Sequence, residues 1–421
     1  MTLSGLSTPL LGMVDTAVMG HLEAAYYLGA VAVGSLVFSF LFWGFGFLRM
    51  GVTGLTAQAI GAENPSEVVG TLSRGLVLAV IFGLLLILFQ NMIISATLFF
   101  IETTENVESN LAVYLDVRIL SAPAALLNYV LLGWFLGIQH PRYTLYLLLL
   151  VNITNIILDV LFVVVWDWRV EGVAWASVCA EYLGLLLGLY LMGRYLKRQA
   201  IAWSWRADMA LNRFAGLFRV SANIFVRTLC LIGSFAFFTL QGAKYGEATL
   251  AANAILMNFQ TFMAHGLDGF AHAAEALVGK YFGKRDYRKM MQAIVVCAFW
   301  SVLIALVFVL FYGLFGGGLI RLLTDITEVQ QTAMTYLPWA IAAPLISVWG
   351  YLFDGIYIGM SWSVAMRNTM LVSTAIFLVV FVMTQQWGNH GLWFALMMFM
   401  LARGVTMGFV FWRKNTGLRF D

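Results

Sequence analysis

The stretch YTLYLLLLVNITNIILDVLFVVVW, residues 143–166, contains a single charged side chain, that of Asp159. A helix that crosses the hydrocarbon core of a bilayer needs roughly 20 mainly apolar residues. This run is long enough, and it lies between the basic residue Arg142 and the tryptophans Trp166 and Trp168. Tryptophan is enriched where a membrane meets water. The stretch therefore predicts a transmembrane helix.

Similar apolar runs recur along the 421 residues. Hydrophobic residues make up 62% of the chain and charged residues 11%, whereas a soluble chain carries about 25% charged residues. The sequence predicts an all-α membrane protein, and Pro123, Pro338 and Pro344 predict kinks in its fourth and tenth helices. We expect twelve transmembrane helices, near residues 1–19, 26–60, 68–90, 108–138, 143–166, 171–194, 212–241, 247–278, 290–314, 328–359, 364–385 and 390–412.

Lysine and arginine are concentrated on one side of this arrangement. If the N-terminus is cytoplasmic, sixteen lie in cytoplasmic segments and three, Arg169, Lys244 and Arg321, lie in the opposite loops. The sixteen are Arg74, Arg142, Arg194, Lys197, Arg198, Arg206, Arg213, Lys280, Lys284, Arg285, Arg288, Lys289, Arg367, Arg413, Lys414 and Arg419. The positive-inside rule then predicts that both termini are cytoplasmic. No basic segment of a cleavable signal peptide precedes the first run, so we expect a multi-pass protein of the inner (plasma) membrane.

The two halves of the sequence resemble each other at a fixed offset. Gly133 in the fourth predicted helix corresponds to Gly355 in the tenth, 222 residues later. A charged connector separates the halves, so we expect one lobe at 1–194, a cytoplasmic linker at 195–211 and a second lobe at 212–421. With six helices each, the halves are parallel repeats. This arrangement is typical of transporters in which two bundles move around a central site.

Polar side chains at bilayer depth form a first group in the N-terminal half. Asp15 lies in the first predicted helix, and Asn152, Asn155 and Asp159 follow one face of the fifth helix. Ser177 in the sixth helix adds a hydroxyl group. Ionisable groups inside a membrane are unfavourable and often functional. The group predicts a site for protons and cationic substrates, and the alternative is a static polar network that joins the helices.

A second polar group lies in the C-terminal half. The eighth predicted helix carries four ionisable residues in one stripe: His265, Asp268, His272 and Glu275. The tenth helix adds Asp354, and the seventh adds Arg219 and Arg227. A structural salt-bridge network, ion or substrate coupling, and a metal site are alternative interpretations, although the spacing matches no metal-ligand motif. We expect Arg118 and Arg403, near predicted helix ends, to extend toward the lipid headgroups.

The sequence also lacks features of several functional classes. It has no Walker A, HExxH or GxSxG motif, so it predicts neither an enzyme nor a protein with a cofactor or a resident metal. The net charge of +3 is not gathered into a basic face, which argues against nucleic acid as a partner. The two-lobed repeat disfavours a passive channel. The expected source of energy is then an ion gradient or a partner subunit.

Several predicted helices contain short sequence motifs with a characteristic order of residues. The first helix contains PLLGMVDTA at 9–17, followed by GHL at 20–22. LSAPA occurs at 120–124 in the fourth helix, and the eighth contains DGFA at 268–271 and EALVG at 275–279. These motifs resemble those of multidrug and toxic compound extrusion (MATE) transporters, in particular the DinF branch, and the resemblance covers essentially the whole chain.

The resemblance implies a V-shaped fold of twelve helices in two six-helix lobes around a cavity. It implies efflux of small amphipathic or cationic drugs by antiport with protons, and we expect a monomer in the lipid bilayer. Asp15, Asn155, Asp159 and Ser177 match the positions of the branch's site residues. In that branch, protonation of the site accompanies bending of the first helix, which expels substrate.

Some departures from the family leave alternatives open. The NorM branch has a glutamate in the seventh helix where this chain has Arg227, although Asp354 matches that branch's aspartate in the tenth. Arg227 argues against a NorM-type sodium site in the C-terminal lobe, whereas Asp354 keeps sodium coupling as an alternative to proton coupling. A lipid or lipid-linked precursor flippase is an alternative function. The family's proline ahead of the first-helix aspartate would precede Met1, so either the start lies upstream or the bending hinge is absent.

Overall fold

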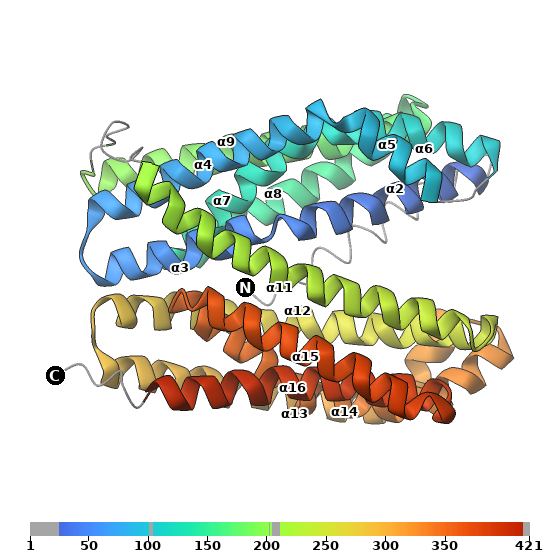
Figure 1. Ribbon diagram of the computed structural model, residues 1–421. Helices are drawn as coiled ribbons and strands as arrows, with labels where there is room; N and C mark the ends of the chain where they lie inside the picture. Colours follow the sequence, from blue (N-terminus) through green and yellow to red (C-terminus); the bar gives the residue numbers. More distant parts are fainter. Residues whose placement is uncertain (1–24, 101–103, 202, 204–210, 416–421) are drawn as a thin grey trace. The chain divides into compact units, whose positions relative to one another are not determined.

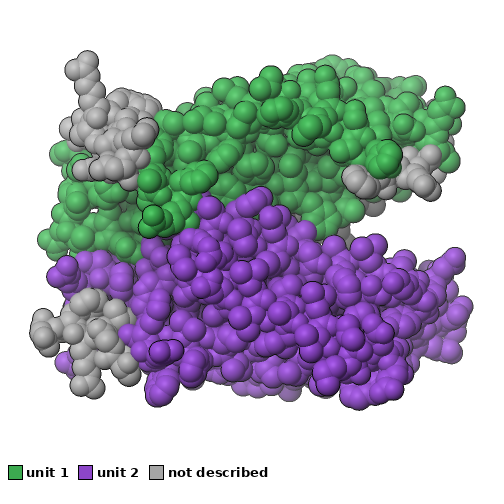
Figure 2. All heavy atoms as spheres, viewed as in Figure 1, with its two compact units in different colours: residues 1, 3–219 green, residues 2, 220–421 purple. Residues whose placement is uncertain are grey.

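The structure is a computed structural model that describes residues 25–100, 104–201, 203 and 211–415. The first predicted helix and its Asp15 lie outside these residues. The described chain divides into two compact units, one ending at Arg219 and the other beginning at Val220 (Figure 2). We call them the N-terminal unit and the C-terminal unit. The expected linker at 195–211 falls largely on residues that are not described.

The helices of the N-terminal unit follow the apolar runs of the sequence (Figure 1). They are α2 (Ala25–Gly44), α3 (Phe47–Gly61), α4 (Pro65–Leu88), α5 (Gln90–Phe100), α6 (Glu105–Arg118), α7 (Ala122–Gly137), α8 (Pro141–Asp159) and α9 (Arg169–Arg198). A 3-10 turn at Ile119–Ser121 interrupts the fourth predicted span just before Pro123. The predicted irregularity at that proline is therefore present.

The C-terminal unit contains longer helices. They are α11 (Leu211–Ala243), which begins in the N-terminal unit, α12 (Glu247–Gly283), α13 (Tyr287–Leu323), α14 (Thr327–Gly359), α15 (Ser363–Thr384) and α16 (Asn389–Asn415). α14 continues through Pro338 and Pro344. A 3-10 turn at Gln385–Trp387 connects the last two helices.

Ten helical segments of the described chain are long and apolar enough to cross a membrane. They match the predicted spans, except that the first is not described and the eighth is not among the ten. The eighth corresponds to α12, a helix of 37 residues whose apolar character is interrupted by Asn253, Gln260 and other polar side chains. The prediction of an all-α membrane protein agrees with this architecture.

The offset of 222 residues recurs in the way the helices begin. Asn64 caps α4 by accepting a hydrogen bond from the backbone N–H of Glu67 at 3.1 Å. Asp286 caps α13 in the same way, with the N–H of Lys289 at 3.0 Å. The residues before the two caps, Glu63 and Arg285, both have positive φ angles, of 53° and 58°. Asparagine and aspartate are favoured caps because their side chains satisfy otherwise unpaired N–H groups.

The same offset recurs in helix packing. A Cβ atom on Gly133 of α7 would lie 2.3 Å from the backbone oxygen of Arg49 in α3. A Cβ atom on Gly355 of α14 would lie 2.3 Å from the backbone oxygen of Ala271 in α12. Gly133 and Gly355 are 222 residues apart, and so are the residues that they approach, Arg49 and Ala271. Small residues permit such close approach of membrane helices. The two units therefore share a packing arrangement that repeats along the chain.

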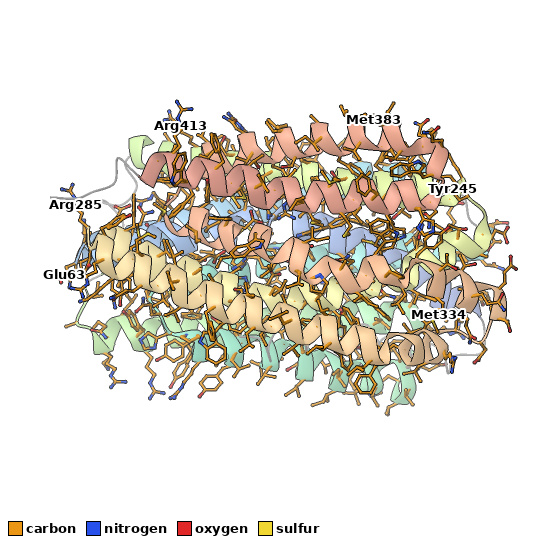
Figure 3. The ribbon with its side chains drawn as sticks, turned by 90° about the horizontal axis from the view of Figure 1, so that it is seen from below. Glu63, Tyr245, Arg285, Met334, Met383 and Arg413 are labelled. Atoms are coloured by element: carbon orange, nitrogen blue, oxygen red, sulfur yellow. The ribbon has the colours of Figure 1, made fainter. Side chains whose placement is uncertain are left out.

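Figure 3 labels side chains at both ends of the helices of the C-terminal unit, and the two arginines among them share one end. Arg285 and Arg413 lie at one end of its helices, and Tyr245 and Met383 lie at the other (Figure 3). The positions of Arg285, which follows α12, and Arg413, near the end of α16, agree with the alternation of the predicted spans. Arg285 and Arg413 thus lie at a common end of this unit.

Candidate functional site

Asp159 ends α8 at a change of helix type. The six residues that follow, Val160–Val165, form a π-helical turn. Single π turns inside helices often occur at functional sites. The side chain of Asp159 is completely buried, with 0% of the residue exposed. The local sequence thus places an acidic group inside the N-terminal unit, where its neighbours determine its chemistry.

The neighbours of Asp159 include an amide and a hydroxyl group. Oriented to suit both neighbours, the Asn155 amide donates to Oδ2 of Asp159 at 3.3 Å. Its carbonyl oxygen then accepts from Oγ of Ser177 at 3.2 Å and from the backbone N–H of Ser177 at 3.1 Å. Asn155 therefore connects the acid of α8 to the hydroxyl of α9. These hydrogen-bonding partners carry no charge.

Asn152 and Asp15 are the other predicted members of the N-terminal polar group. Asn152 is buried on the same helix, one turn before Asn155. Asp15 lies outside the described residues. We define the N-terminal polar cluster as Asn155, Asp159 and Ser177. The sequence predicted the proximity of its members because two of them share a helix face.

A further carboxyl group in this unit was missed by the sequence reasoning. Glu181 follows Ser177 by one turn of α9. The side-chain amide of Asn128, on α7, donates to Oε2 of Glu181 at 2.8 Å and to its backbone oxygen at 2.9 Å. The spacing of four residues from Ser177 was the available signal, since it places Glu181 on the same face of the helix.

In the C-terminal unit, the buried acid Asp354 has arginine side chains as its hydrogen-bonding partners. The carboxylate oxygen Oδ2 of Asp354, on α14, accepts from Nη2 of Arg403, on α16, at 2.8 Å. The same oxygen also accepts from Nη2 of Arg227, on α11. Arg227, Asp354 and Arg403 are all buried. We call these three residues the arginine clamp.

Aromatic rings and further acids surround the arginine clamp. The guanidinium group of Arg403 lies 5.7 Å from the ring centroid of Tyr351 and 5.8 Å from that of Phe399. Asp268 and Glu275 of α12 interact electrostatically with Arg227. The expectation that Arg403 extends to lipid headgroups is wrong, because only 2% of this residue is exposed. Its counter-ion on α14 draws it inward.

The two histidines of the predicted stripe belong to no group of three or more possible metal ligands among the described residues. Nδ1 of His265 is bonded to the backbone oxygen of Thr261, one turn earlier in α12, at 2.8 Å. His272 is partly buried. Within the described residues, no three His, Cys, Asp or Glu side chains are grouped so that they could hold a metal ion. The stripe is therefore divided between the surroundings of the arginine clamp and local hydrogen bonding.

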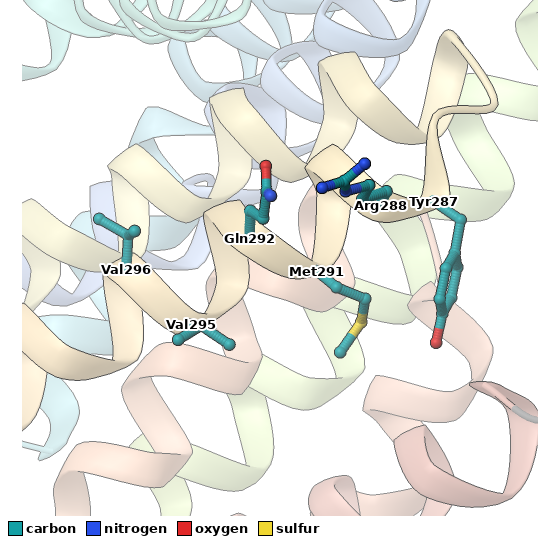
Figure 4. Close-up of a pocket in the computed structure, with 6 residues that line it drawn as sticks. All are labelled: Tyr287, Arg288, Met291, Gln292, Val295 and Val296. Atoms are coloured by element: carbon teal, nitrogen blue, oxygen red, sulfur yellow. The ribbon is translucent and has the colours of Figure 1, made fainter.

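A pocket on the surface of the C-terminal unit is separate from both polar groups. It follows the first turns of α13 (Figure 4), and its lining residues are Tyr287, Arg288, Met291, Gln292, Val295 and Val296. No member of the N-terminal polar cluster or the arginine clamp lines it. We therefore place the candidate site at the buried polar groups.

Comparison with known families agrees with this arrangement of helices and buried acids. The MatE family model matches residues 1–161 and 224–384. The chain belongs to the MATE family. The matched segments begin in the two halves of the chain and have the same length, as expected for an internally repeated transporter.

Named relatives support this family membership. The DNA damage-inducible protein F of Escherichia coli (strain K12) is 42% identical over 99% of this chain and 90% of its own length. A probable multidrug resistance protein NorM of Caulobacter vibrioides is 28% identical over 69% of this chain and 62% of its own length. The resemblance to the DinF branch is thereby confirmed.

Solved structures share the fold. A structure described as the outward-facing conformation of a multidrug resistance MATE family transporter of the MOP superfamily has a TM-score of 0.89, with 18% identity, over 100% of this chain and 94% of its own. A MOP superfamily transporter from Pyrococcus furiosus has the same TM-score and identity over 100% of this chain and 95% of its own. The predicted two-lobed MATE fold is confirmed. The MATE protein is a multi-pass membrane transporter and not an enzyme.

Proposed function

We propose that this MATE protein exports small amphipathic or cationic compounds in exchange for protons. The observation that carries the proposal is the complete burial of Asp159 beside neutral hydrogen-bonding partners. A carboxyl group that is hydrogen-bonded to a neutral amide is able to exist in both protonation states, because an amide can donate to the carboxylate and can accept from the acid. The NorM relative of Caulobacter vibrioides, described as a probable multidrug resistance protein, supports a multidrug substrate range.

The exchange follows from competition for one acidic site. When Asp159 is ionised, its negative charge attracts a cationic substrate, and when it is protonated, that attraction is lost. Binding of proton and substrate is then negatively coupled, and the coupling acts in both directions. Asp15 is proposed as the second carboxyl of the site, and alternating access of the two lobes would expose the site to each side of the membrane in turn.

The bonding of Asp354 in the C-terminal unit favours protons over sodium as the coupling ion. Asp354, the acid at the position of the NorM-branch aspartate, has its Oδ2 atom bonded to both Arg227 and Arg403. Two guanidinium groups at that oxygen oppose the approach of another cation. We further propose an inner-membrane location, cytoplasmic termini, a monomeric state and no bound cofactor.

Transport in proteoliposomes tests this function. Ethidium efflux is measured with either a proton or a sodium gradient imposed, for wild type, Asp159→Asn and Asp15→Asn. We expect a proton gradient alone to drive wild-type efflux and each variant to lose at least ten-fold in rate. Asp325→Asn, in an exposed connection between α13 and α14, is the matched control and should behave as wild type. Efflux by sodium alone, or unchanged efflux by Asp159→Asn, would contradict the proposal.

A further inference from the structure

Glu181 lies deep within α9. It follows Arg169, at the start of the helix, by twelve residues and precedes Arg198, at its end, by seventeen. At 1.5 Å per residue these separations are about 18 and 26 Å. Ser177, Gly184 and Gly188, on the same side of the helix, are buried, so the Glu181 side chain points into the N-terminal unit. An acid at this depth is a functional candidate by default.

Asn128 offers Glu181 two different contacts. Its Nδ2 atom donates to the carboxylate of Glu181, as an ionised acid requires. Its Oδ1 atom is buried and has no hydrogen-bond partner within the described residues. Rotation of the amide by half a turn would present Oδ1 to Glu181, and a protonated carboxyl group would then donate to it. Asn128 is 3% exposed, so this unsatisfied acceptor is shielded from solvent.

The charged and titratable groups around Glu181 come from several helices. Arg118 of α6 interacts electrostatically with Glu181, while its Nη1 atom donates to Oγ of Ser121. Tyr129 of α7 interacts with Glu181, Arg118 and Arg49. Asp159 of α8 is connected through Asn155 to Ser177, which lies one turn before Glu181 on α9. In contrast to Asp354, Glu181 has an amide and not a guanidinium group as its hydrogen-bonding partner.

We propose that Glu181 is a further proton-binding carboxyl of the N-terminal unit, in addition to Asp159 and Asp15, with Asn128 as its positioning residue. This rests on the proton exchange proposed above. Hydrogen bonds join Asp159 to Asn155 and Asn155 to Ser177, and Glu181 follows Ser177 by one turn on the same face of α9. In the proposed step a proton leaves the carboxyl group of Asp159 and is bound by the carboxylate of Glu181. Asp159 is then ionised and able to attract a cationic substrate.

Proton release on substrate binding tests the inference. Purified protein in weakly buffered detergent solution is mixed with ethidium, and released protons are counted with a pH indicator for wild type, Glu181→Gln and Asp159→Asn. We expect Glu181→Gln to retain ethidium binding and to shift the pH at which protons are released. Glu171→Gln, an exposed acid in the first turn of the same helix, is the matched control and should leave the release curve unchanged. A wild-type release curve for Glu181→Gln would overturn the inference.

Infrared spectroscopy of the wild-type chain provides a test that needs no folded Gln variant. Protein labelled with ¹³C in its glutamate carboxyl groups is titrated, and the carboxylic-acid stretching band that shifts with the label reports a protonated glutamate. We expect such a band, and we expect Asn128→Leu to move it in frequency. No glutamate band at any pH of active transport would reject the inference. If Asp159→Asn also leaves proton release unchanged, the proposed function fails; if only Glu181→Gln does, the inference fails alone.

Discussion

Asp159 and Asp354 are both buried acids in membrane helices, but their partners differ in charge. Asp159 is bonded to the neutral amide of Asn155, whereas Asp354 is bonded to two guanidinium groups. Removing the charge of Asp354 would leave Arg227 and Arg403 buried without their shared counter-ion, which is strongly unfavourable. The proposed function assigns the first arrangement to transport and the second to the architecture of the unit.

The comparison predicts its largest effect at the arginine clamp. Asp354→Asn should lower the free energy of unfolding by about 3–5 kcal/mol, because breaking a buried ion pair leaves uncompensated charge. Asp159→Asn should remain close to wild type in stability. The new amide group can still form a hydrogen bond with the side chain of Asn155, as the carboxyl group does. Thermal unfolding in detergent, followed by tryptophan fluorescence, measures both. Equal stability of the two variants would remove the distinction between the acids.

The repeated glycines provide a test of intermediate size. Gly133→Ala and Gly355→Ala should each lower the free energy of unfolding by about 1–3 kcal/mol, because the added Cβ meets a backbone oxygen that has little freedom to move. The two losses should be similar if the two units share one packing arrangement. Gly313→Ala, where nothing lies within 4 Å of the new atom, is the control and should be neutral or slightly stabilising. A harmless Gly355→Ala beside a damaging Gly133→Ala would break the equivalence.

The smallest effect is expected at His140, outside both polar groups. Burial and the nearby charge of Arg198 lower the pKa of His140. The unfolded chain then binds more protons than the folded one, so stability declines as the pH falls below the ordinary histidine pKa of about 6.5. His140→Gln should make this part of the stability–pH curve slightly flatter. A curve unchanged in His140→Gln would show that His140 does not contribute to the pH dependence of stability.

Much of the fold could be predicted because its signals are local. Apolar runs identified the spans that the structure describes, and the 222-residue offset of Gly133 and Gly355 identified the repeat that also appears in helix caps and packing. Asn155 and Asp159 were predicted to lie together because they are four residues apart on one helix. Glu181 was missed because its partner, Asn128, lies 53 residues away on another helix.

The sequence by itself determined which segments enter the membrane, since this depends on the composition of each run of residues. It also determined that acids are buried among them. Only the tertiary structure decided which acid meets which partner: Arg403 bonds to Asp354 across 49 residues, and the expectation drawn from its position near a helix end was wrong. The physical reason is that hydropathy is a property of one segment, whereas charge compensation depends on how several helices pack together.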